Sequence, residues 1–377
     1  MENAKINGTF RILSAIGIIL IVAGHVNLQI FDLGGLFPYY SFHVALFLFI
    51  SGYFYKDSEE EHIGSYIKRK AIRLLLPYFV WNIFYGIFAA VLRSGDFIIG
   101  GNINFRTLFL DPFLDGHQFG YNFAAWFVPA LFIVEIINVC MRRVLSFLKL
   151  KNEYFILLGC LLVGIAVVWM AIGGHVWGYY KFPGRILFML PIFQMGQFYK
   201  KKLEKIDHLS NIAYFSVLLA VQLCIVLGSA GLAYSMVWCS GFANGPIIPY
   251  LTIITGTAFW LRIAKILEPL LSKLRLVEWI GSNTYEVMMH HILGFMMVKG
   301  IFYAISRLTL WCADFEEMAF FTDVNYIYLL NGAEVTKWIY MAAGIGVPFL
   351  MWKLAGCIKQ VGKSKYAKKL CIKDDGR

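Results

Sequence analysis

Ten apolar runs, each about long enough to cross a lipid bilayer, divide the chain from end to end. The hydrocarbon core of a bilayer is about 30 Å thick, so a crossing helix needs about 20 mostly apolar residues. Because lipid offers no hydrogen-bond partners, each segment must satisfy its backbone internally, as a helix does. The expected spans are about 10–30, 37–55, 74–92, 124–141, 153–173, 184–199, 210–230, 246–263, 284–305 and 335–356. We therefore expect an all-α, polytopic integral membrane bundle of about ten transmembrane helices, forming one domain over residues 1–377.

Positive charge is concentrated in every second loop between these runs. The basic groups stand at 56–73, 142–151, 200–205, 262–275 and in a C-terminal tail at about 357–377. Cytoplasmic loops carry the excess of Lys and Arg, so both termini are expected in the cytoplasm. The same distribution explains the net charge of +11 as a membrane-topology signal and argues against a nucleic-acid partner.

The alternate, outer loops are longer and carry aromatic and acidic residues, at about 93–123, 174–183, 231–245 and 306–334. Such surfaces commonly hold hydroxyl-rich substrates, although any single acid there is also explained by exposure to water. Two of the seven cysteines, Cys239 and Cys312, fall in these loops and could pair. The cysteines show no paired metal-ligand spacing, so no metal site is expected.

The first apolar run, Phe10 to His25, carries an arginine near one end and a histidine at the other. Arg11 and His25 are fourteen residues apart, about 21 Å along a helix and close to four turns, so they share one face. A titratable side chain in a membrane span is costly and is by default a functional candidate. The alternative is an interfacial histidine that hydrogen-bonds a neighbour.

A basic stretch, Tyr66 to Arg73, precedes the third run and contains Arg69, Lys70 and Arg73. Basic residues just inside a span are ordinary topology determinants. Alternatively, they form a cytosolic site for a polyphosphate or nucleotide group, because guanidinium groups match phosphate geometry.

Polar side chains also occur inside the predicted spans. Such groups usually face the bundle interior and pair with one another, and some only hold helices together. The set comprises Asn82, Glu135, Gln194, Gln197, Gln222, Glu286, His290 and His291. A second span that carries histidines favours a polar cavity, which His43 could also line from the outer end of the second span.

The order of these features resembles the membrane-bound acyltransferase-3 family, which includes bacterial O-antigen, capsule and peptidoglycan O-acetyltransferases. The resemblance covers most of the chain. It rests on five segments: the first run ending Val22-Ala-Gly-His25, then 42–53, the basic stretch entering Leu-Leu-Leu-Pro77-Tyr-Phe-Val-Trp81, then 125–132, and Trp279-Ile-Gly-Ser-Asn-Thr284 followed by His291.

The resemblance implies transfer of an acyl group, usually acetyl, from cytosolic acyl-CoA to a hydroxyl of a glycan across the bacterial plasma (inner) membrane. His25 would be the general base or a transient acyl carrier. The family's first-helix arginine falls at Ser14 here, and Arg11, one turn earlier, is expected to replace it. Lys70 and Arg73 match a family pair of arginines.

The expected partners are acyl-CoA (acetyl-CoA first), a glycan or lipid-linked saccharide acceptor and membrane lipid, with a homodimer left open. The residues expected at the CoA head are Arg11, Ser14, Arg69, Lys70 and Arg73. Those expected around the substrate are His43, Asn82, Trp126, Glu135, Glu286, His290 and His291. The competing interpretation is a translocator of polysaccharide or lipid-linked oligosaccharide that transfers no acyl group.

Overall fold

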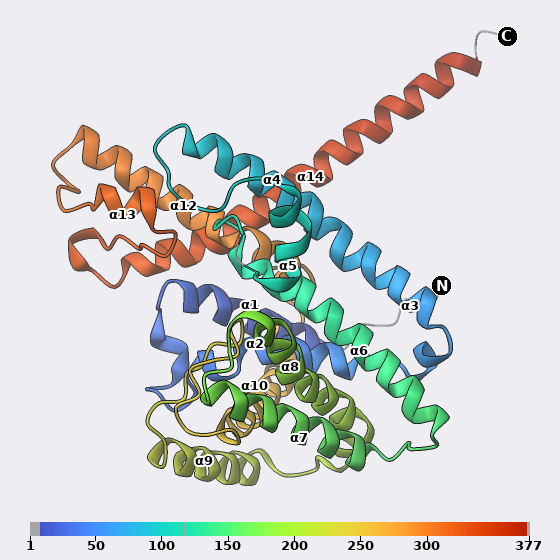
Figure 1. Ribbon diagram of the computed structural model, residues 1–377. Helices are drawn as coiled ribbons and strands as arrows, with labels where there is room; N and C mark the ends of the chain where they lie inside the picture. Colours follow the sequence, from blue (N-terminus) through green and yellow to red (C-terminus); the bar gives the residue numbers. More distant parts are fainter. Residues whose placement is uncertain (1–7, 117, 375–377) are drawn as a thin grey trace.

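The computed structural model describes residues 8–116 and 118–374, and this part of the chain is helical, with no strand beyond an isolated bridge (Figure 1). Within these residues, seven helical segments are long and apolar enough to cross a membrane. They are α1 (Gly8–His25), the stretch Ile63–Arg93, the stretch Phe123–Phe147, α7 (Glu153–Ile172), α10 (Ile248–Leu271), α12 (Thr284–Leu308) and Thr336–Cys357 of α14. The all-α membrane bundle expected from the apolar runs is therefore confirmed.

Three further predicted spans also form helices, but these are too short or not apolar enough to count as crossing segments: α2 (His43–Tyr53), α8 (Lys181–Phe198) and α9 (Asn211–Leu227). The second span was expected from residue 37, but α2 begins only at His43. Pro38 precedes a 3-10 turn, Tyr39–Ser41, so the aromatic residues at this position lie before the helix and not in it. The first span was expected to reach residue 30, but α1 ends at His25, and Asn27 already has a left-handed backbone with φ of 52°.

The basic stretch and the third span form one continuous helical segment. It consists of α3 (Ile63–Lys70), a π-helical turn (Ala71–Leu75) and α4 (Leu76–Arg93). Pro77 lacks the backbone N–H that a regular turn would use, and a wider turn before it accommodates that loss.

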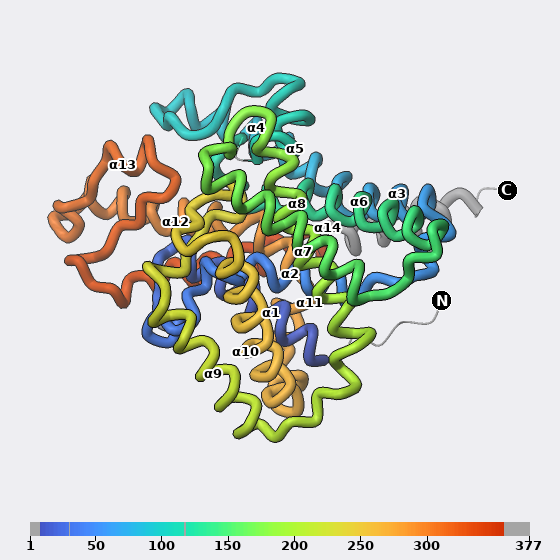
Figure 2. Tube along the Cα trace, turned by 60° about the horizontal axis from the view of Figure 1, so that its bottom comes forward, coloured from blue at the N-terminus to red at the C-terminus, as the bar shows by residue number. Residues whose placement is uncertain are grey.

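Helix α1 lies inside the bundle and contacts α2, α10, α11 (Arg275–Ser282) and α12. Around it, α12 packs along α14 (Thr336–Asp374), and α8 packs against both α2 and α7. Figure 2 shows α9 at the edge of the bundle, as does Figure 1. Buried residues of α1 include Leu13, Val22 and Ala23, so its apolar surface is covered by protein.

Glycines allow the closest helix contacts. A Cβ on Gly52 of α2 would lie 1.9 Å from the carbonyl oxygen of Phe193 in α8, and one on Gly196 would lie 2.0 Å from that of Phe49. Small residues let membrane helices approach to backbone contact in this way.

We call the end of the bundle with the basic loops the inner end, and the opposite end, with the loops 94–122, 228–247 and 309–335, the outer end. Two short helices lie in the outer loops, α5 (Asp111–Leu114) and α13 (Glu317–Thr322). Cys239 and Cys312 are both buried and free, so the pairing considered from sequence is wrong. The predicted basic tail continues α14 as far as Asp374, and residues 375–377 lie outside the described residues.

Candidate active site

The outer end of α1 is held in place by two neighbouring segments. The Tyr40 hydroxyl donates a hydrogen bond to the carbonyl of Gly24 (3.0 Å), and Lys337 Nζ donates one to the carbonyl of Asn27 (3.0 Å). Carbonyl groups at a helix C-terminus lack the usual partners within the helix; the Gly24 carbonyl also accepts the Asn27 N–H (3.1 Å), and the two side-chain donors add to the hydrogen bonds that hold this end. His25, the last residue of α1, is thereby fixed at the boundary between the bundle and the outer loops.

Two rings bracket the His25 imidazole. The ring of His291 from α12 stacks on it with centroids 5.1 Å apart and planes 28° apart. The ring of Phe123 meets it edge-on, with centroids 4.9 Å apart. The rings of two histidines, from helices far apart in the sequence, are therefore in direct contact.

The hydrogen bond of His291 indicates which ring nitrogen carries the proton and which carries the lone pair. Its Nδ1 lies 2.9 Å from the carbonyl oxygen of Val287, which can only accept, so Nδ1 carries the proton. In the neutral ring the lone pair is then on Nε2. That nitrogen is buried and has no hydrogen-bond partner within the described part of the chain.

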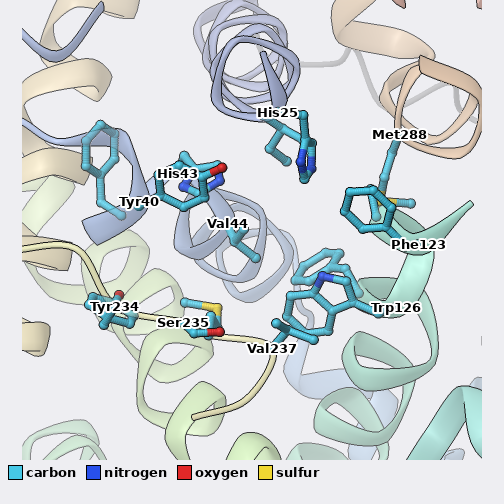
Figure 3. Close-up of a pocket in the computed structure, with 15 residues that line it drawn as sticks. His25, Tyr40, His43, Val44, Phe123, Trp126, Tyr234, Ser235, Val237 and Met288 are labelled. Carbon is cyan, nitrogen blue, oxygen red and sulfur yellow. The ribbon is translucent and has the colours of Figure 1, made fainter. Parts of the chain in front are cut away.

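His25 opens onto a cavity of about 120 Å³. Figure 3 shows His25 on one side of it, with His43, Trp126 and the segment around Ser235 on the others. The lining is mostly apolar and aromatic with a few polar groups, the usual composition of a small-molecule site. Its members are Ile21, His25, Tyr40, Phe42, His43, Val44, Phe123, Ala124, Trp126, Phe127, Tyr234, Ser235, Met236, Val237 and Met288.

The lining brings His43 and Trp126 to the same cavity as His25. The Nδ1 of His43 is hydrogen-bonded to the carbonyl of Tyr39, one turn earlier. Trp126 is the last residue of a 3-10 turn, Phe123–Trp126, that leads into α6 (Phe127–Phe147).

His290 belongs to a different cluster from His291. Consecutive residues on a helix point about 100° apart, so one histidine faces α1 while the other faces α4. His290 Nδ1 lies 2.8 Å from the Tyr85 hydroxyl, and its ring packs edge-on against Trp81 at 4.3 Å. Glu286 Oε2 lies 3.5 Å from His290 Nε2 and lines a separate opening between α4, α12 and α14. His290 and Glu286, both expected around the substrate, are therefore not part of the lining of the His25 cavity.

Asn82 and Glu135 are also absent from the lining of the His25 cavity. Asn82 donates to the carbonyl of Leu108 (2.9 Å) and accepts from the Asn122 amide (3.1 Å), so it anchors the outer loop that precedes Trp126. Glu135 accepts a charge-assisted hydrogen bond from Lys70 at 2.5 Å.

The residues expected to bind CoA lie towards the inner end, and most have protein partners. Arg11 Nη1 donates to Glu278 Oε1 of α11 (2.9 Å), and the Ser14 hydroxyl donates to the carbonyl of Phe10 in its own helix (2.8 Å). Arg69 Nη2 donates to Glu59 (2.5 Å). Arg73 is exposed on the π-helical turn.

Sequence reasoning missed several residues of the His25 cavity. Met288 precedes His291 by three residues, so helical periodicity alone could have placed it on the same face. Tyr40 precedes His43 by three residues, but it lies in the loop before α2. Tyr234 and Ser235 come from the loop between α9 and α10, and no local sequence signal indicates that this loop covers the cavity.

These features define a multi-pass helical membrane protein with a histidine-centred cavity at one end of its central helix. A family model described as an acyltransferase domain, acyltransferase-3, matches residues 10–352. The chain therefore belongs to the acyltransferase-3 family. Comparison with curated proteins gives no match, and comparison with solved structures gives none either.

Proposed function

We propose that this protein is an O-acyltransferase that moves an acyl group, acetyl first, from cytosolic acyl-CoA to a hydroxyl of an extracytoplasmic or lipid-linked glycan. The family supplies the reaction class, acyl transfer. The observation that carries the proposal is the contact of His25 with His291 at an aromatic cavity among the outer loops. The bacterial plasma membrane is the proposed location.

Two reaction sequences are compatible with this arrangement. In the first, the acceptor oxygen attacks the thioester carbonyl while His25 takes the hydroxyl proton, the C–S bond breaks, and the CoA thiolate then takes that proton. In the second, an imidazole nitrogen attacks the thioester, CoA leaves, and the acceptor hydroxyl cleaves the acyl-imidazole. The stacked His291 ring offers a second nitrogen base in contact with His25.

The CoA head is proposed to bind at the inner end, where the basic residues lie. Arg69 is paired with Glu59 in an exposed contact, and exposed pairs contribute at most about 1 kcal/mol, so phosphate can replace that carboxylate at little cost. Arg73 is exposed and adds a second guanidinium. Lys70 is held by buried Glu135, so Arg69 and Arg73 are the stronger candidates, with Arg11 and Ser14 nearer the bundle.

The dimensions of the cavity favour an enzyme over a translocator. A saccharide path across the membrane requires a wide polar channel. The space at His25 is about 120 Å³ and is walled by side chains such as Phe123 and Trp126, which suits an acyl group meeting one hydroxyl.

The deciding experiment measures acetyl-CoA binding to the purified full chain in detergent and follows free CoA by chromatography. We expect slow CoA release that His25→Ala lowers by at least about 100-fold, the lower range for loss of a general base. His175→Ala, at an exposed outer-loop histidine, is the matched control and should keep the wild-type rate. Undiminished release by His25→Ala would reject the catalytic assignment. No binding of acetyl-CoA or longer acyl-CoA would favour the translocator.

A further inference from the structure

A second hollow lies in the outer loops, and it has a volume of about 390 Å³. It is lined by Gly100, Gly101, Thr107, Asp111, Asp115, Gln118 and Trp238. We propose that this hollow is a binding subsite for an uncharged sugar unit of the acceptor, which it holds beside the His25 cavity. The role of the bound sugar as acceptor rests on the proposed function, whereas binding of the sugar does not.

The amide of Gln118 indicates that the hollow is built to receive a ligand. Gln118 is 8% exposed and lines the hollow, yet its Nε2 is buried and has no hydrogen-bond partner among the described residues. A buried donor without a partner is destabilising, and such groups are rare in folded proteins. A rotation of the amide towards the hollow would let a sugar hydroxyl oxygen accept the hydrogen bond that the protein leaves unmade.

The backbone around Gln118 is held in position by the rest of the loop. The Gly101 N–H donates to the carbonyl of Gln118 (2.7 Å). Arg93 at the end of α4 donates to the carbonyls of Gly100 (2.8 Å) and Gly101 (3.0 Å). The Gly101–Gln118 hydrogen bond thus joins the two sides of the hollow, and Arg93 fixes the side that contains Gly100 and Gly101.

The charges in the hollow favour an uncharged ligand. Asp111 accepts from Arg106 Nε (3.0 Å), and Asp115 is paired with Lys181. Each carboxylate has a cationic partner, yet a carboxylate has about four acceptor positions and retains capacity for hydroxyl donors. The indole of Trp238 also lines the hollow; Lys181 Nζ lies over its ring at 4.1 Å, so a pyranose ring would pack against the part of the indole that Lys181 leaves uncovered.

The hollow and the His25 cavity share a wall. Arg185, which is fully buried, lies over the Trp126 ring at 5.6 Å and donates to the carbonyls of Phe113 (2.5 Å) and Asp115 (3.4 Å). Asp115 lines the hollow, while Trp126 lines the cavity.

Two further contacts bring the hollow and the cavity together. A Cβ on Gly116 would lie 2.9 Å from Trp126 Cβ, so this backbone packs directly against the Trp126 side chain. On the other side, one loop contributes Trp238 to the hollow and Ser235 to the cavity. A saccharide held in the hollow would therefore have a neighbouring hydroxyl close to the cavity.

The test measures saccharide binding by calorimetry on the purified full chain, without acyl donor and in a detergent that contains no sugar. The probes are maltotetraose and N-acetylchitotetraose, with tetragalacturonate as the anionic counterpart. We expect at least one uncharged probe to bind. Gln118→Ala should weaken that binding by about three- to tenfold, the range for one hydrogen bond, and should leave the melting temperature near the wild-type value, because the Nε2 donor has no partner among the described residues. Trp238→Ala should weaken it by about tenfold, the range for a buried aromatic contact.

The controls are Gln29→Ala and Trp311→Ala, which remove exposed side chains of the same types elsewhere in the outer loops. They should bind as the wild type does. No binding of any probe at millimolar concentration, binding of tetragalacturonate alone, or equal weakening by the control variants would overturn the subsite. The two proposals fail separately: saccharide binding without acyl transfer rejects the enzyme alone, and His25-dependent CoA release without saccharide binding rejects the subsite alone.

Discussion

Lys70 Nζ lies 2.5 Å from Glu135 Oε1 and joins the basic stretch to the interior of α6. The Glu135 side chain is 2% exposed and that of Lys70 is 28% exposed. The other carboxylate oxygen of Glu135 is buried and has no hydrogen-bond partner in the described residues. Lys70 is therefore the direct counter-charge of a carboxylate inside the bundle, besides any role it has in binding phosphate.

Lys70→Ala should destabilise the fold. Removing one partner of a buried ion pair costs up to about 3–5 kcal/mol, because the remaining charge stays buried and uncompensated. The double variant Lys70→Met/Glu135→Leu should recover most of the loss, since apolar pairs of similar volume replace such ion pairs well. Unfolding followed in detergent compares the two. A double variant as unstable as Lys70→Ala would contradict this account of the pair.

Arg73→Ala tests phosphate binding while keeping the Lys70–Glu135 hydrogen bond. We expect weaker acyl-CoA affinity, with a difference from wild type that shrinks as salt rises, because screening over about 10 Å at 0.1 M ionic strength weakens exposed charge interactions. Equilibrium binding at low and high salt measures it. Arg143→Ala, at another exposed arginine of the inner end, serves as control and should bind as wild type. Equal losses in the two variants would show a nonspecific charge effect.

The adjacent histidines of α12 should respond differently to the same substitution. His291→Phe keeps an aromatic ring against His25 but removes Nε2, and we expect CoA release to fall by about 10- to 100-fold, at the lower end of a proton-transfer contribution. His290→Phe breaks the hydrogen bond to Tyr85 and should lower stability by about 1 kcal/mol while release continues. CoA release rates and unfolding curves of both variants test this. If His290→Phe slowed CoA release and His291→Phe did not, the reacting centre would lie beside α4 instead.

Alanine substitutions at glycine positions should show which helix–helix contacts require a glycine. Gly52→Ala and Gly196→Ala each place a Cβ about 2 Å from a carbonyl oxygen, so the α2–α8 crossing must open, and we expect losses of several kcal/mol, of the order of overpacking in a core. Gly159→Ala in α7 has nothing within 4 Å and should be neutral or stabilising by up to about 1 kcal/mol through helix propensity. Heat stability of the three variants checks the contrast, and similar values for all three would contradict the close approach.

The spans were predictable because the length and apolarity of a run are local properties of the sequence. The resemblance included His291, but the stacking of its ring on His25 was not predicted. What sequence could not supply were contacts between segments far apart: Tyr85 with His290, Lys70 with Glu135, and Arg11 with Glu278. Each depends on which helix faces turn toward one another, and that is decided by packing rather than by any single segment.

Helix α2 has only eleven residues, about 16 Å of rise, roughly half the thickness of the hydrocarbon core. Its outer end carries His43, on the wall of the His25 cavity, and loops occupy the position above it. In the orientation that the basic loops predict, these loops would stand where the outer part of a full-length span would otherwise lie. Under the proposed function, an acceptor arriving from outside would reach His25 through these loops, and the apolar distance left for the acyl donor would be shorter than a full crossing of the bilayer.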